Sequence, residues 1–526
     1  MDKTRRRVSP RLAKISVSEE TLLREICQET YAQLLIDLPL ALFDWRMKVT
    51  RTNQSAIDHR RAFLVASATG LAGMPFGVSP AALEANYLNA TNGTSGGRAK
   101  SVILFFLCGG SSHIDMWDLK PDAPSDYRGP FLPIATSASG VSVSEHLPLT
   151  AKQMHHLAVI RSVSGSVNTN DHHAGYYYQL TGHIPDPTFL SQGNDRRPYS
   201  DDWPFIGSVV AARRPLHASL PNAMTFPHMP SKAPYTRPGQ FSARLGVEFD
   251  PMYVHGSLEE PMKFQAPSLV LAGDITTEQL QTRKKLLDKL DGARRNFEGV
   301  HSVQAWKQHQ LRTIDLMMSS STTTAFDVES EPESIRGRYG KTVNAMSLLL
   351  ARRLVEAQVP FITVFWKEND AIADKCKSGG GWDTHGNNFG CLKENLLPEF
   401  DMAFSALVED LHQRGLLDQT LLMVTSEMGR KPKIGDPRSG GPGGAGRDHW
   451  THCMSVVMGG GGIRGGQTFG SSDRFGEYPA EHPVTPADIA KTVYHAMGIE
   501  DLHARDAQGR PYQLLDEGKP IAPLFA

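Results

Sequence analysis

The sequence predicts an α/β fold, a three-layer sandwich in which helices cover both faces of a mostly parallel central sheet. Three observations lead to this prediction. Continuous apolar runs are typical of strands that are buried on both faces. Segments with helical periodicity alternate with these runs, as they do where crossover helices join parallel strands. The composition, with 40% hydrophobic and 21% charged residues, is that of a globular protein.

The strands are expected where short apolar runs occur. In chain order these are SVILFFLCGG from Ser101, Leu157–Val163, Ala223–Phe226, PFITVFW from Pro360, TLLMVTSE from Thr420 and MSVVMGG from Met454.

The helices are expected where apolar residues recur at helical spacing. The first is DHHAGYYYQLTG from Asp171, which ends at a glycine. Two helices are expected within Thr276–Met317, one over Ile335–Gln358 and one at about Leu396–Arg414. A closing helix is expected in TPADIAKTVYHAMGI from Thr485, which has a proline near its start.

Charge and cysteine usage narrow the function. The net charge is −1, with 55 Lys and Arg against 56 Asp and Glu, which gives no sign of nucleic acid or an anionic membrane as a partner. The 526 residues suit one large domain or two. The five cysteines include no CxxC pair, and at most Cys376 and Cys391 could form a bridge.

The segment 60–88 resembles a twin-arginine export signal. Arg60 and Arg61 precede a mildly apolar stretch and then small residues, with cleavage expected near Ala82–Ala85. The apolar stretch is too short and weak for a membrane span. We therefore expect export to the periplasm or the extracellular space. The alternative is an ordinary buried helix that follows two surface arginines.

Residues 1–59 form an extension far longer than the basic region of such a signal. A start at Met47 would give a well-proportioned signal, so we hypothesise that Met1–Arg46 is an upstream extension or the result of a misassigned start. A polar, glycine-rich linker is expected at 89–100. Residues 101–526 are then expected to form one domain, with a loop-rich and helical insertion at about 186–335.

Polar clusters follow most of the predicted strands, at the edge where α/β sheets bind their ligands. They are CGGSSHIDMWD, NTNDHHAG, GWDTHGN and SEMGR. The exception is GRDHWTH, which precedes the strand from Met454 and would have to reach the site from a long glycine-rich loop.

Carboxylates and imidazoles are the side chains that bind divalent metals. Asp383 and His385 can both turn toward one ion from a loop. Glu427 ends a buried strand, where an unpaired carboxylate would cost several kcal/mol unless a metal or Arg430 compensated it. The candidate metal ligands are His113, Asp115, Asp383, His385, Glu427, Asp448, His449 and His452.

Each cluster has an ordinary structural interpretation on its own. Ser112 and Asp171 could simply cap helices, Asp383–His385 could form a turn, and Arg430 and Arg447 could pair with surface carboxylates. The occurrence of all five clusters in one chain favours a functional site.

The motifs GGSSHIDMWDLKPDAP, GGWDTHGNN, TSEMGRKPKIG and GRDHW resemble those of a bacterial family catalogued as domain of unknown function 1501. The resemblance covers nearly all of Ser101–Ile499. That family is placed in the alkaline phosphatase and sulfatase superfamily. The resemblance therefore implies an alkaline phosphatase-like sandwich with one or two metals at the strand ends, and hydrolysis or transfer of phosphate or sulfate esters.

Within this resemblance, VTSEMG is similar to the sulfatase stretch Thr-Ser-Asp-His-Gly, which places Glu427 at a ligand position and Met428 where a histidine would stand. DHHAGYYYQLTGHIP resembles the sulfatase helix that opens with the nucleophile, which places His172 at the nucleophile position. GRDHWTH would supply a late ligand, either His449 or His452.

Two features depart from the superfamily pattern. The first strand ends in LCGG, where a ligand aspartate is usual, so His113 or Asp115 would have to compensate. The nucleophile position carries no serine, threonine or cysteine, unless Ser166 or Thr169 reaches it.

We expect an exported hydrolase of phosphate or sulfate esters that depends on one or two divalent ions, which could be zinc, manganese, calcium or magnesium. His172 or His173 would act as general acid or base, and Arg430 or Arg447 would hold the anionic group. Direct attack by water is simpler than a phosphohistidine at His172. The partner is then a small anionic ester or a sulfated or phosphorylated glycan. The alternative is a non-catalytic exported protein that retains the fold and binds metal or glycan.

Overall fold

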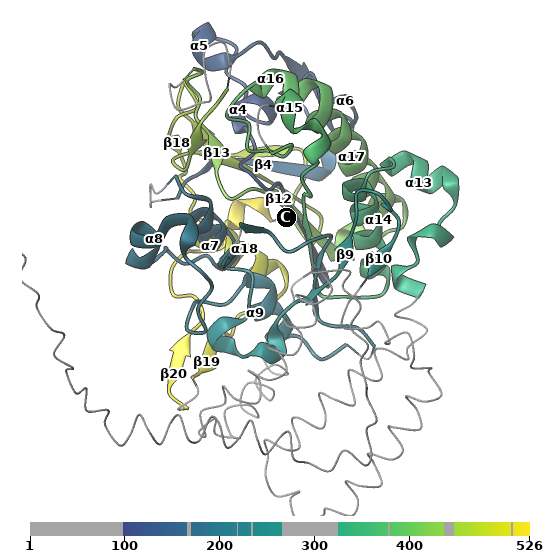
Figure 1. Ribbon diagram of the computed structural model, residues 1–526, viewed down its shortest axis with the longest axis vertical. Coiled ribbons are helices and arrows are strands. Elements are labelled where there is room, and N and C mark those ends of the chain that lie inside the picture. Colours follow the sequence, from purple (N-terminus) through teal and green to yellow (C-terminus); the bar gives the residue numbers. More distant parts are fainter. Residues whose placement is uncertain are drawn as a thin grey trace, which may run out of the picture. The chain divides into compact units, whose positions relative to one another are not determined.

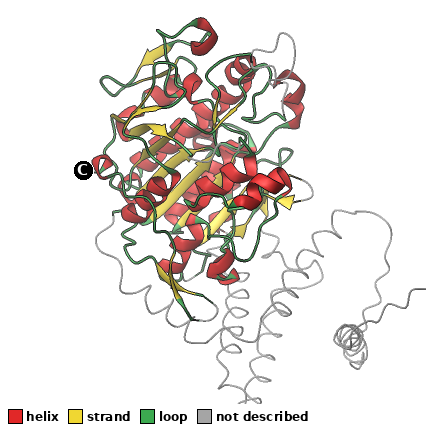
Figure 2. Cartoon of the chain, turned by 90° about the vertical axis from the view of Figure 1, so that its left-hand side faces the viewer, coloured by secondary structure: helices red, strands yellow, loops and turns green. Residues whose placement is uncertain are grey.

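An eight-stranded sheet forms the centre of the protein. The computed structural model describes residues 98–165, 170–217, 219–232, 235–265, 324–376, 379–435, 446–506 and 509–525. The strands lie side by side between helices in Figure 2. In order across the sheet they are β16 (Gln467–Phe469), β4 (Leu157–Val163), β15 (Met454–Gly459), β12 (Thr420–Thr425), β1 (Ser101–Phe106), β11 (Phe361–Phe365), β5 (Ala223–Phe226) and β8 (Met252–Tyr253).

The sheet is parallel except at β15, which runs antiparallel to both β4 and β12. β1 lies at the centre and pairs in parallel with β11 and β12. The predicted α/β fold with a mostly parallel sheet is therefore confirmed.

Helices cover both faces because the buried side chains of β1 alternate between two apolar cores. Ile103 and Phe105 belong to one core, and Val102 and Leu104 to the other. In Figure 1 α14 and α17 lie on one side of the strands, with α7 and α9 on the other. The covering helices are α14 (Val343–Glu356) and α17 (Leu397–Gln413) on the first face, and α7 (His172–Thr181), α9 (Ile206–Arg213) and α18 (Pro486–Ala496) on the second.

The single helix predicted over Ile335–Gln358 is wrong. The chain forms α13 (Glu333–Tyr339) and then α14, separated at Gly340, whose φ of 115° lies outside the helical region. Thr342 then caps α14, since its side chain accepts a hydrogen bond from the backbone N–H of Ala345.

Short elements complete the described chain. The two-stranded pairs are β2 (Pro133–Ala135) with β3 (Ser142–Ser144), β6 (Ser231–Lys232) with β7 (Tyr235–Thr236), β9 (His255–Gly256) with β10 (Phe264–Gln265), β13 (Gly429–Arg430) with β14 (His449–Trp450), β17 (Ser471–Ser472) with β18 (Pro479–Glu481), and β19 (His503–Arg505) with β20 (Pro511–Gln513). The short helices are α4 (His113–Met116), α5 (Ser125–Arg128), α6 (Pro148–Ala151), α8 (Pro187–Gln192), α15 (Ala373–Cys376) and α16 (Asn388–Cys391).

The direction of β15 explains why GRDHWTH precedes a strand instead of following one. Because β15 is antiparallel to its neighbours, its first residue, Met454, lies at the edge where β4 and β12 end. The residues just before β15 therefore reach the same edge as those after the parallel strands.

Cys376 and Cys391 form a disulfide, as the sequence allowed.

Several predictions concern segments outside the described residues. These segments are the extension, the export signal, the linker up to residue 97 and the two helices predicted within Thr276–Met317. Among the helices that are described, none combines the length and the apolar character needed to cross a membrane. The insertion at about 186–335 stays a prediction.

The disulfide closes a loop with a sequence separation of 15 residues, and this loop carries Asp383 and His385. Replacing both cysteines by serine should lower the free energy of unfolding by about 3 kcal/mol, because the unfolded chain regains the entropy of the open loop. Urea denaturation of the wild type and the double variant measures this. Reductant should destabilise the wild type only; equal stability of the two oxidised proteins would contradict the prediction.

Candidate metal centre

Asp383 lies at the centre of a cluster of histidines beyond the carboxyl ends of the strands. The preceding residue, Trp382, is buried against Trp366 and Phe400, and its N–H donates to the carbonyl of Cys108 (3.2 Å). The loop that carries Asp383 is thus anchored directly on the end of β1.

Gly109 makes this close approach possible. A β-carbon at this position would lie 2.4 Å from the backbone nitrogen of Asp383, and its φ is +120°. The N–H of Gly109 donates to Oε1 of Glu427 (2.8 Å). Gly109 therefore supplies a backbone donor to Glu427 and the space for Asp383.

Arg430 connects β1, the loop of Asp383 and the end of β12. Its fully buried guanidinium donates from Nε to the carbonyl of Gly110 (2.8 Å) and from Nη2 to the carbonyl of Gly109 and to Oδ1 of Asp383. Burial alone would raise the pKa of Asp383, but the charge of Arg430 and the hydrogen bonds of the surrounding histidines hold it far below its usual range. Asp383 is therefore a carboxylate.

His172 is placed by the start of α7, where Asp171 caps the helix by accepting from the N–H groups of His173 and Ala174. Asp171 therefore caps the helix, as one interpretation of this segment predicted, and the same helix start brings His172 to the cluster. Nδ1 of His172 lies 2.8 Å from Oε1 of Glu427, and Nε2 lies 3.4 Å from Oδ2 of Asp383.

His449 approaches Asp383 from β14, which pairs with β13 so that His449 lies opposite Arg430. Its Nδ1 lies 2.7 Å from the carbonyl oxygen of Asn170, and its Nε2 lies 3.1 Å from Oδ1 of Asp383.

His385 completes the cluster. Its Nε2 lies 3.0 Å from Oδ1 of Asp383 and 3.0 Å from Nε2 of His449, while its Nδ1 lies 3.3 Å from Oδ1 of Asp448.

Two of the three imidazoles, those of His172 and His449, direct Nδ1 at an oxygen acceptor and Nε2 at Asp383. Nδ1 of the third, His385, makes no hydrogen bond among the described residues. Since a carbonyl or carboxylate oxygen can only accept, Nδ1 of His172 and of His449 carries the hydrogen, and the neutral ring has its lone pair on Nε2. This is the arrangement by which proteins orient histidines that bind a metal. The separations of 3.0 and 3.1 Å around Asp383 are close to the roughly 3.3 Å between ligands of a tetrahedral zinc ion. The residues therefore fit a metal ion.

Two overlapping groups could each hold an ion, namely His172, Asp383 and His449, and His385, Asp448 and His449. They share His449, whose Nδ1 is bonded to Asn170. Because His449 has only Nε2 to offer, it cannot serve both groups at once. The geometry therefore fits one ion better than two.

The buried groups behind the cluster compensate one another. Burial alone would raise the pKa of Glu427, but the hydrogen bond and charge of His172 outweigh it and lower the pKa. Burial alone would lower the pKa of His172, but hydrogen bonds with Asp383 and Glu427 raise it. Burial lowers the pKa of His449, which favours its neutral form.

The cluster is reachable from solvent on the side of Asp383 and His385. Their side chains are 32% and 28% exposed, whereas that of Glu427 is fully buried. A small molecule could therefore contact Asp383 and His385 without any rearrangement of Glu427.

Asp115 and Arg447 form a buried pair next to the cluster. Nε and Nη2 of Arg447 donate to the two carboxylate oxygens of Asp115 (2.8 and 3.0 Å), which also accepts from Ser112 and Asn388. The remaining donors of Arg447 face backbone carbonyls, so this pair is occupied by groups other than Asp383.

Three of the predicted histidines lie apart from Asp383. Nε2 of His113 lies 2.8 Å from the carbonyl of Gly476. Nδ1 of His173 lies 2.8 Å from the carbonyl of Arg196. The ring of His452 packs on those of Trp450 and Tyr478.

Comparison with known proteins identifies the family. Residues 99–525 match the family described as "Protein of unknown function (DUF1501)". The chain belongs to the DUF1501 family. No curated protein matches it.

Several solved structures are similar to this DUF1501 protein. Wild-type alkaline phosphatase PafA is 10% identical, with a TM-score of 0.38, over 82% of this chain and 100% of that one. The phosphonate monoester hydrolase SpPMH of Silicibacter pomeroyi is 12% identical, with a TM-score of 0.37, over 81% and 76%. The PsFucS1 sulfatase of Pseudoalteromonas sp. is 13% identical, with a TM-score of 0.34, over 80% and 71%.

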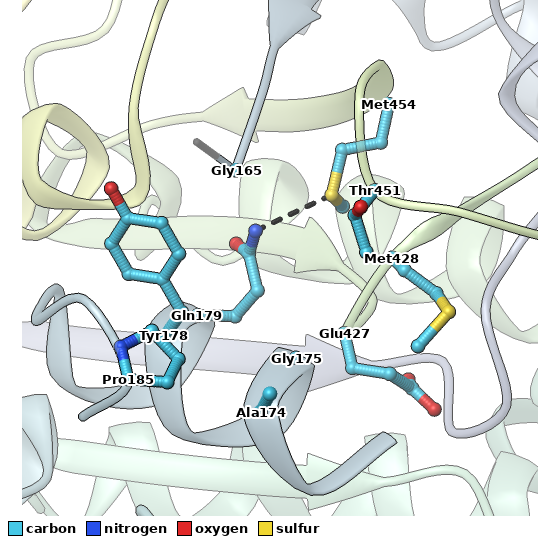
Figure 3. Close-up of a pocket in the computed structure, with 10 residues that line it drawn as sticks. All are labelled: Gly165, Ala174, Gly175, Tyr178, Gln179, Pro185, Glu427, Met428, Thr451 and Met454. Carbon is cyan, nitrogen blue, oxygen red and sulfur yellow. Dashed lines mark hydrogen bonds between the residues drawn. The ribbon is translucent and has the colours of Figure 1, made fainter. Parts of the chain in front are cut away.

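A small pocket, partly open to solvent, lies behind Glu427, between α7 and the start of β15. Figure 3 shows Gln179 reaching across it to Met454, with Nε2 3.4 Å from Sδ, while the carboxylate of Glu427 points away from them. A β-carbon at Gly175 would lie 2.7 Å from the carbonyl oxygen of Glu427. This glycine thus lets α7 pack against the end of β12 and brings His172 to the cluster.

Sequence analysis missed Asn170, because it acts through its backbone carbonyl, which any residue type would supply.

Gly109→Ala should disrupt the centre, since the new β-carbon meets the backbone of Asp383 and the φ of +120° is unfavourable for alanine. We expect a loss of about 3 kcal/mol or more in unfolding free energy and weaker metal binding, measured by denaturation and metal titration. Gly337→Ala is the control, because nothing lies near its β-carbon position. Gly109→Ala with wild-type stability and metal affinity would refute this role.

Proposed function

We propose that the protein is a hydrolase of phosphate or sulfate esters whose metal ion is held by His172, Asp383, His385 and His449. One observation carries the proposal: three imidazoles, two of them oriented by a hydrogen bond at Nδ1, turn Nε2 toward an ionised and partly exposed carboxylate. The motifs around Glu427 and His172, which are similar to sulfatase motifs, support the alkaline phosphatase and sulfatase superfamily as its relatives.

The ligand set favours zinc, or a similar transition metal, over calcium and magnesium. Calcium and magnesium prefer shells of oxygen atoms, whereas zinc, manganese and iron accept several imidazoles. When bound, such an ion supplies Lewis acidity, which polarises an ester oxygen and makes water more acidic.

The other residues of the cluster orient the ligands. Glu427 holds His172, Asp448 lies against Nδ1 of His385, and the carbonyl of Asn170 holds His449. Glu427, which the sequence presented as a ligand, is thus better placed to orient an imidazole. Asp448, the other such residue, lies 3.3 Å from Nδ1 of His385 without a hydrogen bond to that atom. Arg430 keeps Asp383 ionised.

Water is the nucleophile that this arrangement favours. Cys108 lies next to Gly109, but burial and the charge of Glu427 raise the pKa of its thiol well above the usual value, and a protonated thiol is a poor nucleophile. His172 is held between two carboxylates, which restricts it to orienting or ligand roles. Ser166 and Thr169 lie outside the described residues.

Export to an oxidising compartment agrees with the disulfide between Cys376 and Cys391, since such bonds persist in secreted and periplasmic proteins. The twin-arginine route is part of the proposal. The substrate would be a small anionic ester or a sulfated or phosphorylated glycan.

A non-catalytic role is the second candidate, and one observation favours it. Four protein ligands can fill a tetrahedral shell, which is typical of structural metal sites, whereas catalytic zinc keeps an open position. The exposed fractions of Asp383 and His385 favour the catalytic role instead, because they leave one side of the centre accessible.

Metal content and ester hydrolysis test the proposal together. The purified full chain, loaded with zinc, should hold one ion and hydrolyse an aryl phosphate or an aryl sulfate. His449→Ala should lose the ion and reduce hydrolysis by more than the roughly 10- to 100-fold that loss of an orienting residue costs. His452→Ala is the matched control: it removes a histidine of the same loop that lies outside the cluster, and both properties should persist.

Loss of metal in both variants, or in neither, would contradict the assignment of the ligands. A zinc-loaded wild type that hydrolyses neither ester class would reject the hydrolase and leave the binding protein.

A further inference from the structure

An anionic ester at this centre requires a cation that is free to bind it, and neither arginine singled out from the sequence is free. Every nitrogen of the Arg430 guanidinium donates to a carbonyl or to Asp383. Arg447 donates to Asp115 and to the carbonyls of Tyr127, Lys431 and Pro432. Both guanidiniums are also fully buried.

Arg237 is placed differently. It follows β7, in the loop that continues from β5, and its guanidinium carbon lies 4.9 Å from the ring centroid of Tyr176. Tyr176 belongs to α7, one helical turn after His172, so the two side chains lie on the same face of the helix. Arg237 is thus held over the helix that carries a proposed ligand.

The backbone of this loop is fixed. The N–H of Arg237 donates to the carbonyl of Pro230 (3.2 Å), and its carbonyl accepts from Nε2 of Gln240 (2.8 Å). A β-carbon at Gly239 would lie 2.8 Å from the α-carbon of Tyr177, which shows how closely the loop packs on α7.

Among the described residues, one nitrogen of the Arg237 guanidinium is left without a hydrogen-bond partner. Nη1 is buried and makes no hydrogen bond, and among the described residues no carboxylate oxygen lies within 4.0 Å of its nitrogens. Nε2 of the fully buried His173 likewise has no partner. An unpaired buried donor such as Nη1 of Arg237 is costly unless a ligand satisfies it.

We propose that Arg237 binds the oxygen atoms of the phosphate or sulfate group of the substrate. That the substrate is an ester rests on the proposed function. That an oxyanion binds here rests on the position and the unpaired donor of Arg237. The planar fork of a guanidinium suits two oxygens of a tetrahedral anion. Its charge offsets the repulsion that Asp383, Glu427 and Asp448 exert on an incoming anion.

Binding of inorganic sulfate and inorganic phosphate to the zinc-loaded full chain, measured by calorimetry, tests the proposal. Arg237→Met should weaken binding of at least one anion roughly tenfold or more, and Arg237→Lys should weaken it less, since lysine keeps the charge without the fork. Arg197→Met removes the same charge at an exposed arginine and should bind like the wild type. Zinc content should be unchanged in all variants.

Equal anion affinity of Arg237→Met and wild type, or no binding of either anion by the wild type, would overturn the proposal. If Arg237→Met fails to fold, Arg237→Lys decides: unchanged anion affinity overturns the proposal. Anion binding that depends on Arg237 in a protein without ester hydrolysis would reject the proposed function alone. If a folded Arg237→Met variant hydrolyses esters with unchanged kcat/KM, the proposed role of Arg237 is rejected and the proposed function is not.

Discussion

The ion pair between Arg430 and Asp383 is the interaction on which the centre depends. A buried guanidinium needs acceptors in several directions, and Arg430 finds them in the carbonyls of Gly109 and Gly110 and in Asp383. Arg430 lies next to the end of β12. Its side chain therefore connects the end of β1 to the loop that carries Asp383. With the carboxylate fixed and ionised, His172, His385 and His449 can each turn Nε2 toward it.

The fold and most of the cluster could be predicted from sequence because both follow from one-dimensional patterns. The apolar run from Ser101 specifies a strand buried on both faces, and polar residues after such strands meet at one edge of the sheet. What could not be predicted depends on pairing across the fold. The antiparallel direction of β15 brings His449 to this edge, and no local feature of MSVVMGG reveals it. Likewise, the break at Gly340 depends on a φ value that an amphipathic pattern does not record.

The roles of the arginines and carboxylates also could not be predicted from sequence, because they depend on contacts across the fold. Arg430, Arg447, Glu427 and Asp448 are all close to the cluster, but residue type does not tell whether a side chain faces a substrate or another side chain. In the structure Arg447 is occupied by Asp115, and Glu427 by His172. Arg237, whose buried Nη1 has no hydrogen bond among the described residues, stands in a segment that contains no recognisable motif. Saturation of hydrogen bonds, which only three-dimensional contacts reveal, separates the groups that support the site from those that can bind a ligand.

X-ray absorption spectroscopy of the zinc-loaded full chain tests the convergence of the three histidines on Asp383 most directly. The account predicts one zinc with four nitrogen or oxygen ligands at about 2.0–2.1 Å and the outer-shell scattering of three imidazoles. A zinc shell that contains sulfur, or that shows the scattering of fewer than two imidazoles, would contradict it.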